Sequence, residues 1–398
     1  MSRFRLYPTP PQQDALLEQC GYARYVWNLA LEQWAMWTPD KTAAPGFAEQ
    51  CRQLTEARAV FGWLRTGSQT VQQQALRDFD QAVRNFYAGT HRRPTWRKAG
   101  LHEGFRIVGS QASRIVKLSR KWAKVNVPKV GSVRFRLTRA VPDAKSYRIT
   151  RDRMGRWHIA FAVIPKSIPA PGGGEVVGVD RGVTVSAALS TGELLTCPGL
   201  SETEQERLKQ LQRRLSRCRR GSNRRRRVQV AIAKLHARAG DRRKDWVEKV
   251  STDLAGRFDV IRVEDLRVAP MTRRPRPKPD PERPGAYLPN RRRAKAGLNR
   301  GILANGWGQL VVRLEHKAVG RVEKINPAYT SQTCSVCGHR APGNRESQAV
   351  FRCVACGHQA NADVNAAINI AAGRAVRARR ETPPWVSPKR EPQHATSA

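Results

Sequence analysis

The chain has 398 residues, of which 73 are Lys or Arg and 32 are Asp or Glu, so its net charge is +41. Hydrophobic residues make up 40% of it, which is enough for two or three domains with their own cores. A charge of this size attracts polyanions and indicates a nucleic-acid partner. No apolar run approaches the length of about 18 residues that crosses a membrane, and the N-terminus lacks the apolar core of a signal peptide. We therefore expect no membrane partner and a cytoplasmic location.

The N-terminal part begins with a short strand and continues with helices. Residues 3–7 alternate as in a strand. A helix opened by Pro11 follows, and a second helix takes Ser68 as its N-cap. Between them, residues 38–47 carry Pro, Thr and Gly and are predicted to form a loop. These signals predict a helical domain at residues 9–89.

Strand signals dominate the next stretch. The composition changes from about Arg93. At 113–137 and 146–164, β-branched and aromatic residues alternate with basic ones, and the turn at 153–156 indicates a hairpin. The segment IPAPGGG at 168–174 is typical of a linker. We expect residues 1–8 and 90–170 to form one small antiparallel barrel that the helical domain interrupts.

Two apolar strands in the second half of the chain end in a carboxylate. VVGV at 176–179 is followed by Asp180, and FDVIRV at 258–263 is followed by Glu264. Between them, a capping-box pattern opens a helical hairpin at 201–255 that is dense in arginine. We expect its arginines to contact phosphates, and the candidates are Arg213, Arg214, Arg217, Arg224, Arg225, Arg226 and Arg227.

The following segment mixes loop and helix signals. Residues 271–294 are rich in Pro and Arg and are expected to be mobile without a ligand. A single helix is predicted at about 299–318, and a strand at 321–325.

Four clustered cysteines predict a metal site. Cys334 and Cys337 form one CxxC pair, Cys353 and Cys356 form another, and 15 residues separate the pairs. This spacing is typical of a zinc site in which four thiolates surround the ion. Four protein ligands leave no open coordination position, so we predict a structural zinc ribbon at residues 331–358.

A third carboxylate follows the cysteines. Asp363 comes seven residues after Cys356, in the first turn of a helix predicted from about Ala362. Taken singly, Asp180, Glu264 and Asp363 each fit an ordinary loop or a helix dipole. Together, carboxylates at the ends of sheet elements can converge, and they then need divalent cations among them. Two Mg²⁺ ions held in this way would suit hydrolysis of a phosphodiester.

Several motifs, in order and spacing, resemble the TnpB proteins of bacterial insertion sequences, the ancestors of type V CRISPR effectors. The resemblance covers about residues 1–375. The motifs are GVDRGV (178–183), VEDL (263–266), LNRGILANGWGQL (298–310), YTSQTCSVCG (329–338) and FRCVACGHQANADVNAA (351–367).

The resemblance implies an α/β fold with a ribonuclease-H-like (RuvC) nuclease domain that carries an inserted zinc ribbon. Its segments would be 175–200, 256–330 and 359–378. The arginine-rich helices would be a further insertion, the N-terminal barrel a wedge domain, and the helices within it a recognition domain. The tail at 379–398 is expected to be disordered.

The resemblance also implies an activity, that of an RNA-guided, Mg²⁺-dependent DNA endonuclease of a transposable element. Asp180, Glu264 and Asp363 match the three catalytic acids of the family, and the cysteines match its zinc ribbon. The implied partners are a guide RNA from the transposon end and a double-stranded DNA target. The protein would act as a monomer in its ribonucleoprotein, associated with a bacterial nucleoid.

Alternatives stay open at this level. A nuclease-inactive regulator would bind DNA without cutting it, and a compact type V CRISPR effector would share this ancestry. A strand-joining transposase would need a catalytic tyrosine beside a His-x-His pair, which the sequence does not contain. One position departs from the family pattern, because Arg181 stands where many relatives have an apolar residue.

Overall fold

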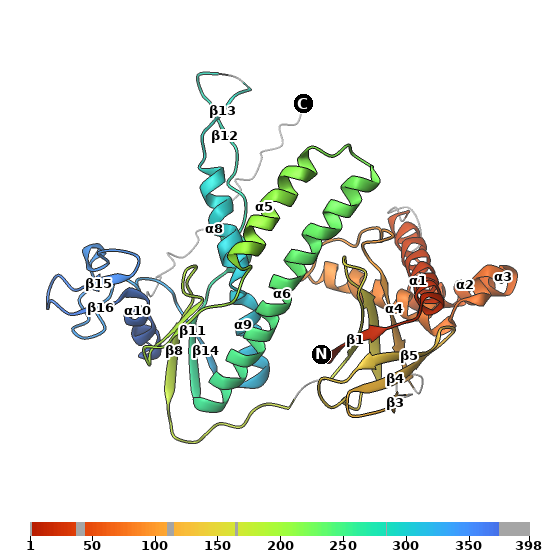
Figure 1. Cartoon of the computed structure of the whole chain (residues 1–398), viewed down its shortest axis with the longest axis horizontal. Coiled ribbons are helices and arrows are strands. Elements are labelled where there is room, and N and C mark those ends of the chain that lie inside the picture. Colours follow the sequence, from red (N-terminus) through yellow and green to blue (C-terminus); the bar gives the residue numbers. More distant parts are fainter. Residues whose placement is uncertain (1, 37–43, 110–114, 164–165, 284, 374–398) are drawn as a thin grey trace, which may run out of the picture. The chain divides into compact units, whose positions relative to one another are not determined.

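The computed structural model describes residues 2–36, 44–109, 115–163, 166–283 and 285–373 (Figure 1). The predicted disordered tail lies outside these residues. The chain forms two compact units, each built around its own sheet. The first consists of Met1–Lys166 and Leu200–Ala239, and the second of Ser167–Gly199 and Gly240–Ala398.

A seven-stranded antiparallel sheet forms the centre of the first unit, in the order β2-β6-β7-β1-β5-β4-β3. The N-terminal strand lies in the middle, between β5 and β7, and its Phe4 and Leu6 are buried. In the described residues β2 and β3 remain edges, so the expected barrel is open. The strands are β1 (Ser2–Tyr7), β2 (Gly104–Val108), β3 (Ile115–Lys117), β4 (Trp122–Val127), β5 (Gly131–Arg136), β6 (Ser146–Arg151) and β7 (Trp157–Phe161).

Four helices of the first unit lie between β1 and β2 in the chain and pack against this sheet. They are α1 (Pro10–Ala35), α2 (Phe47–Val60), α3 (Gly62–Thr66) and α4 (Gln69–Tyr87). The N-cap position of Ser68 is as predicted. Helices α2 and α3 were not predicted, because the buried residues of α2 are only Gln50 and Leu54 and no apolar stripe marks it.

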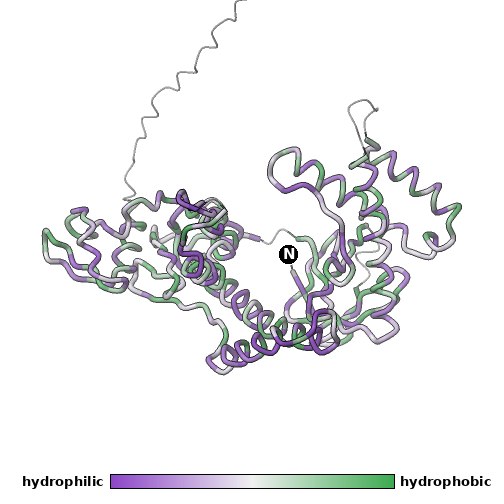
Figure 2. The backbone as a smooth tube through the Cα atoms, turned by 90° about the horizontal axis from the view of Figure 1, so that it is seen from above, coloured by the Kyte–Doolittle hydropathy of each residue, from purple (hydrophilic) through white to green (hydrophobic). Residues whose placement is uncertain are grey.

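The arginine-rich segment forms a helical hairpin, α5 (Glu202–Ser216) and α6 (Asn223–Arg257), whose helices lie side by side in Figure 1. The predicted capping box is present: Ser201 Oγ accepts from the Glu204 backbone N–H, and the Glu204 carboxylate accepts in return. Leu211, Val228 and Leu235 are buried between the two helices. Hydrophilic and hydrophobic residues alternate along the backbone (Figure 2), as amphipathic elements with one buried face require.

The second unit is built on a five-stranded sheet, in the order β10-β9-β8-β11-β14. β11 runs parallel to both β8 and β14, whereas β9 runs antiparallel to β8. Val177 and Val179 of β8 and Ile261 and Val263 of β11 are fully buried, and they share one core with helix residues such as Leu310 and Leu314. The strands are β8 (Val176–Asp180), β9 (Ala187–Leu189), β10 (Leu194–Leu195), β11 (Val260–Glu264) and β14 (Val322–Ile325).

The helix predicted at about 299–318 is in fact two helices. Gly306 has a φ of 68°, which a residue with a side chain rarely adopts, and it ends the helical path. The neighbouring Asn305 donates to the Val183 carbonyl at 2.7 Å. The break therefore lets side chains at this point bind the loop after β8. The helices are α8 (Arg292–Ala304) and α9 (Trp307–Lys317).

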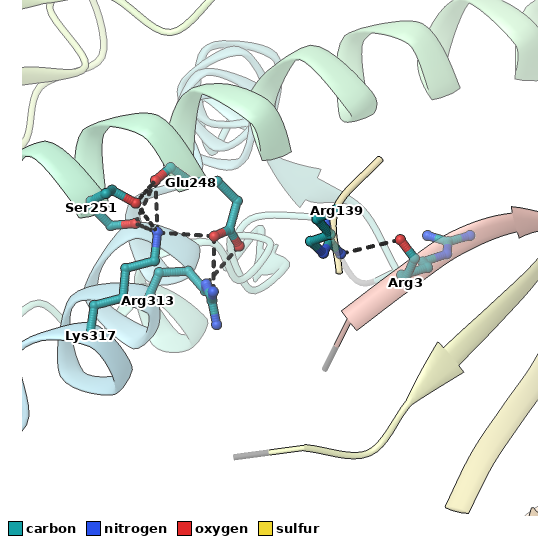
Figure 3. A network of polar contacts seen from close by, with 7 residues as sticks. Arg3, Arg139, Glu248, Ser251, Arg313 and Lys317 are labelled. Carbon is teal, nitrogen blue, oxygen red and sulfur yellow. Dashed lines mark hydrogen bonds and ion pairs between the residues drawn. The ribbon is translucent and has the colours of Figure 1, made fainter. Parts of the chain in front are cut away.

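A buried lysine joins α9 to the C-terminal part of α6. The ammonium group of Lys317 donates to Ser251 Oγ at 2.8 Å and to the Glu248 carbonyl at 2.7 Å, and it pairs with the Glu248 carboxylate at 3.0 Å. Arg313 binds the same carboxylate, and Figure 3 shows both basic residues pointing to it from α9.

The remaining elements are short. The proline- and arginine-rich segment, expected to be mobile, follows α7 and contains a two-stranded hairpin. Cys353 and Cys356 lie on a second hairpin followed by a helix, and Cys334 and Cys337 lie between Thr333 and Arg340, which form an isolated β-bridge. These elements are α7 (Val268–Met271), β12 (Lys278–Pro279), β13 (Tyr287–Leu288), η2 (Pro342–Asn344), β15 (Val350–Arg352), β16 (Gln359–Asn361) and α10 (Ala362–Ala371). Among the helices of the described ranges, we find none with the length and hydropathy that crossing a bilayer requires.

Candidate active site and zinc ribbon

Asp180 and Glu264 are neighbours at the carboxyl edge of the sheet. Each is the last residue of its strand, and the parallel register pairs Val179 with Val263. The two carboxylates therefore follow paired positions on adjacent strands. The carboxyl edge of a parallel sheet is where such proteins place their ligands.

Asp363 reaches the same point from α10. The helix packs so closely on β8 that a Cβ at Gly178 would lie 2.0 Å from the Ala367 carbonyl oxygen. Asn361 caps it, because its Oδ1 accepts from the backbone N–H of Asp363 at 3.0 Å and from that of Val364 at 3.2 Å. Close packing and the cap together place Asp363 in the first turn, beside the ends of β8 and β11.

The protonation behaviour of the acids reflects this convergence. Burial, Glu264 and Asp363 together raise the pKa of Asp180 to about 7. Burial also raises the pKa of Glu264 and of Asp363. Each ionised carboxylate disfavours ionisation of its neighbours, so the cluster takes up protons or binds cations to remain buried. This is the environment that a divalent metal ion would stabilise.

A loop of the cysteine region reaches the acids. The Arg345 guanidinium lies 3.4 Å from Asp363 Oδ1, and its charge opposes the larger rise in pKa that burial causes in Asp363 and Asp180. Gln348, three residues later, donates to Thr184 Oγ1 at 3.1 Å in the loop after β8. The contact of Arg345 with Asp363 was not predicted, because no local pattern indicates a contact with a residue 18 positions away.

The four cysteines form the zinc-type cluster that their spacing predicts. Among the described residues, theirs is the group of metal-ligating side chains whose donor atoms all lie within 4.8 Å of one another. Cys334 Sγ lies 3.8 Å from Cys356 Sγ, and Cys337 Sγ lies 3.6 Å from Cys353 Sγ. A tetrahedron with Zn–S bonds of about 2.3 Å has edges of roughly 3.8 Å, whereas a disulfide would need about 2.05 Å. The cysteines therefore fit a zinc ion.

The carboxylate oxygens of the three acids do not form a group as compact as that of the cysteine sulfurs. Two metal ions of a hydrolytic pair lie about 3.5–4 Å apart, so their ligands spread around two centres. Carboxylates arranged for such a pair need not surround a single point. The acids are thus compatible with a two-ion site and unlike the compact thiolate cage.

The base of the ribbon is tied to the helix that carries Asp363. Asn365 of α10 accepts from the Ser335 N–H at 3.0 Å and donates to the Thr333 carbonyl at 2.8 Å. Asn369, one turn later, donates to the carbonyls of Thr330 and Thr333. These four hydrogen bonds therefore fix the base of the ribbon against α10. No role was predicted for the asparagines of the NADVNAAIN segment, although their spacing of four residues places them on one helix face.

The same ribbon base contacts a second acid. Thr330 is buried, and its hydroxyl donates to Glu264 Oε1 at 3.0 Å. Glu264 is thereby oriented from the segment that leads into the first cysteine pair. A metal ion among the cysteines would order both this contact and the position of Asp363.

Known proteins resemble the chain over nearly its full length. It is 33% identical over 386 residues to "Putative RNA-guided DNA endonuclease InsQ" of Escherichia coli (strain K12), covering 94% of this chain and 92% of that protein. The chain belongs to the TnpB family. A protein of Streptomyces pristinaespiralis with the name "Putative RNA-guided DNA endonuclease" is 28% identical over 99% of this chain and 96% of its own length.

Three family descriptions match parts of this TnpB chain. "Probable transposase" matches residues 158–274, "Cas12f1-like, TNB domain" matches 307–370, and "Helix-turn-helix domain" matches 2–38. The cysteines and Asp363 fall within the second match. In the structure, the last match corresponds to strand β1 and the single long helix α1.

A solved structure has the same fold as this TnpB protein. The Cas12f1–sgRNA–target DNA complex matches with a TM-score of 0.54 at 13% identity, covering 89% of this chain and 81% of that one. The "CRISPR-associated endodeoxyribonuclease Cas12f1" of Sulfoacidibacillus thermotolerans is 54% identical over 63 residues, 16% of this chain and 15% of its own length. These matches show that the chain shares its fold with the Cas12f1 protein of that complex and that residues 307–370 match a TNB domain.

Arg181, the residue directly after Asp180, has a structural role. It is 5% exposed, and its guanidinium donates to the backbone carbonyls of Glu264 and Trp307. Burial lowers its pKa, while Glu264 and Asp180 raise it. The buried cation thus holds the end of β11 in place and compensates part of the acidic charge.

The predicted phosphate-binding arginines of this TnpB chain divide into two groups. Arg225 is half-buried, and its guanidinium donates to the carbonyls of Leu215 at 2.8 Å and Cys218 at 3.2 Å. It therefore joins the start of α6 to the end of α5. The other six are exposed, and they are Arg213, Arg214, Arg217, Arg224, Arg226 and Arg227.

Proposed function

We propose that this protein is an RNA-guided DNA endonuclease of a transposable element that hydrolyses phosphodiester bonds. The observation that carries the proposal is the convergence of Asp180, Glu264 and Asp363 in a chain of net charge +41. Buried acids that interact this strongly are costly unless they bind cations. A basic protein with one acidic centre is suited to cut a polyanion that it also holds.

The three acids are the proposed catalytic residues and the ligands of two Mg²⁺ ions. Bound there, the ions would activate the attacking water and stabilise the leaving 3′ oxygen. Glu264 is oriented for this role by Thr330, and Asp363 by the cap of α10. Arg345 compensates the charge of Asp363 at the edge of the site.

The proposed partners are a guide RNA from the transposon end and a double-stranded DNA target. The full-length relatives are named RNA-guided endonucleases, and the Cas12f1 complex contains both kinds of nucleic acid. Base pairing with the guide would select the sequence, while the protein would recognise duplex shape and phosphates. The N-terminal sheet would serve as wedge domain, the helices at 9–89 as recognition domain, and the particle would contain one copy of the protein in the bacterial nucleoid.

We propose that the four cysteines bind a zinc ion with a structural role. Four thiolates complete its coordination and exclude hydrolytic chemistry at that ion. The contacts of Asn365 and Thr330 support a role for the ribbon as a clamp on Asp363 and Glu264. The clamp would act through position and would leave the chemistry to the acids.

Cleavage of a guide-matched DNA duplex by wild-type protein and by an Asp180→Ala variant tests the proposal. The variant should lose Mg²⁺-dependent cleavage while RNA-directed DNA binding remains, because the substitution removes a metal ligand and no phosphate contact. A nuclease-inactive regulator would instead show the same binding and no cleavage by either protein. Full-rate cleavage by the variant would refute the assignment of Asp180.

A further inference from the structure

The helical hairpin carries more positive charge than its own fold requires. Residues 205–227 contain 11 Lys or Arg and a single acidic residue, Glu206. The four consecutive arginines from Arg224 to Arg227 lie in the first turns of α6, where the helix dipole disfavours cations, and no acidic residue lies in its first turn. Local charge and helix dipole thus oppose each other in the free protein.

One of these arginines has a structural explanation. Arg225 donates to two carbonyls at the end of α5, where the helix dipole favours a cation. In the part of the chain that the structure describes, Arg214, Arg224 and Arg227 have no hydrogen-bond or ion-pair partner. An unfavourable charge without an internal partner is typical of a site that an external anion completes.

Four arginines of the hairpin line one groove. Arg207 and Arg214 of α5 and Arg224 and Arg227 of α6 border a hollow of about 400 Å³. Its floor contains the buried apolar side chains Leu211 and Val228, and none of its lining residues is acidic. The groove therefore combines two basic walls with an apolar floor.

The dimensions of the groove indicate which kind of ligand it can hold. Arg207 and Arg214 are seven residues apart, which is roughly 10 Å along the helix. A duplex turn is about 34 Å long, and small-molecule sites span roughly 300–1,000 Å³. The hollow accommodates one or two nucleotide units, with phosphates on the basic walls and sugars over the apolar floor.

We infer that this groove binds the phosphodiester backbone of a single nucleic-acid strand. The inference rests on the proposed function for the presence of such a strand, either the unpaired part of a guide RNA or a displaced DNA strand. It adds Arg207 to the binding residues expected from sequence and removes Arg225 from them. Arg214, Arg224 and Arg227 remain, and they act together as one site.

Salt-dependent binding by two matched variants of the full-length protein tests this. One variant changes the groove residues Arg207, Arg214, Arg224 and Arg227 to Gln. The control removes the same charge from the same hairpin, and it changes Arg213, Arg217, Arg220 and Arg226 to Gln. Each variant is titrated with a single-stranded RNA, with DNA of the same sequence, and with the duplex of the two.

The slope of log K against log salt should fall by about 0.7 for each phosphate of a single strand that the variant no longer neutralises. The slope of the groove variant should fall by up to about 2.8, and that of the control clearly less. A larger reduction on RNA identifies the guide as the ligand, and a larger reduction on DNA identifies the displaced strand. An equal reduction in both variants, or one confined to the duplex, would overturn the inference.

Folding and catalysis are checked separately. Arg225→Gln should lower the melting temperature, while the groove variant should melt at the wild-type temperature or above, because three of its four arginines have no internal partner among the described residues. The Asp180→Ala variant should keep the wild-type slope of log K against log salt. Binding at the groove can then be lost or kept independently of cleavage. If the groove variant had a lower melting temperature than Arg225→Gln, the four groove arginines would be structural, and the inference would be contradicted.

Discussion

Gly178 determines how closely the helix carrying Asp363 approaches the strand carrying Asp180. A Cβ at this position would lie 2.0 Å from the Ala367 carbonyl oxygen and 2.4 Å from the Ala371 backbone nitrogen. Both atoms belong to the backbone of α10, so no side-chain rotation relieves the overlap. Gly178→Ala should therefore displace α10 from β8.

The size of the displacement follows from these distances. Real Cβ atoms essentially never approach closer than 3.0 Å, so the helix must move by at least 1.0 Å. A misplacement of about 1 Å costs on the order of 100-fold in catalytic rate. Overpacking of this kind also lowers the free energy of unfolding by about 1–3 kcal/mol.

Single-turnover cleavage of a guide-matched duplex measures the effect, with RNA-directed DNA binding measured in parallel. Binding should stay close to wild type, because the arginine-rich hairpin is unchanged. Gly308→Ala is the matched control, since its added Cβ meets nothing within 4 Å on the exposed face of α9. If Gly178→Ala cleaves at the wild-type rate, the placement of Asp363 by close packing is refuted.

Three further predictions concern the zinc ribbon, the buried lysine and pH. Cys353→Ser should lose protein-bound zinc by metal analysis, melt at a lower temperature and cleave poorly; retained zinc with full activity would contradict the clamp. Lys317→Met should lower the free energy of unfolding by roughly 2–4 kcal/mol in urea denaturation, because it removes the hydrogen bonds that the buried ammonium group donates to Glu248 and Ser251; an unchanged midpoint would show that water replaces the ammonium group. Burial, with Arg3 nearby, lowers the pKa of His158 from 6.5 to about 4. Between these values the unfolded chain binds a proton that the folded chain does not, so stability should fall as pH falls through this window. His158→Gln should show a shallower dependence, and an unchanged one would rule out His158 as the source.

Much of the candidate site is encoded in short segments of sequence. Cys334 and Cys337 are three positions apart, so their convergence follows from one turn, and the second pair repeats it. The ends of β8 and β11 were predictable because apolar runs stop at Asp180 and Glu264. Local patterns of this kind need no knowledge of distant contacts.

Elements without a local signature were missed. Helix α2 lacks an apolar stripe, and the break at Gly306 depends on a backbone conformation that the sequence does not display. The role of Arg345 could not be predicted, since its contact partner Asp363 lies 18 residues further along the chain. The sequence also offered no way to separate Arg225 from its neighbours, although its hydrogen bonds to α5 make it structural.

The sequence by itself determined the chemistry that this protein has available: a strongly basic chain, four thiolates spaced for zinc, and three carboxylates at the ends of apolar segments. Only the tertiary structure decided how these groups are used. The parallel register sets Asp180 beside Glu264, and the lack of a side chain at Gly178 lets α10 bring Asp363 to them. The reason is physical: residue type is a local property, whereas convergence depends on packing between segments more than 80 residues apart.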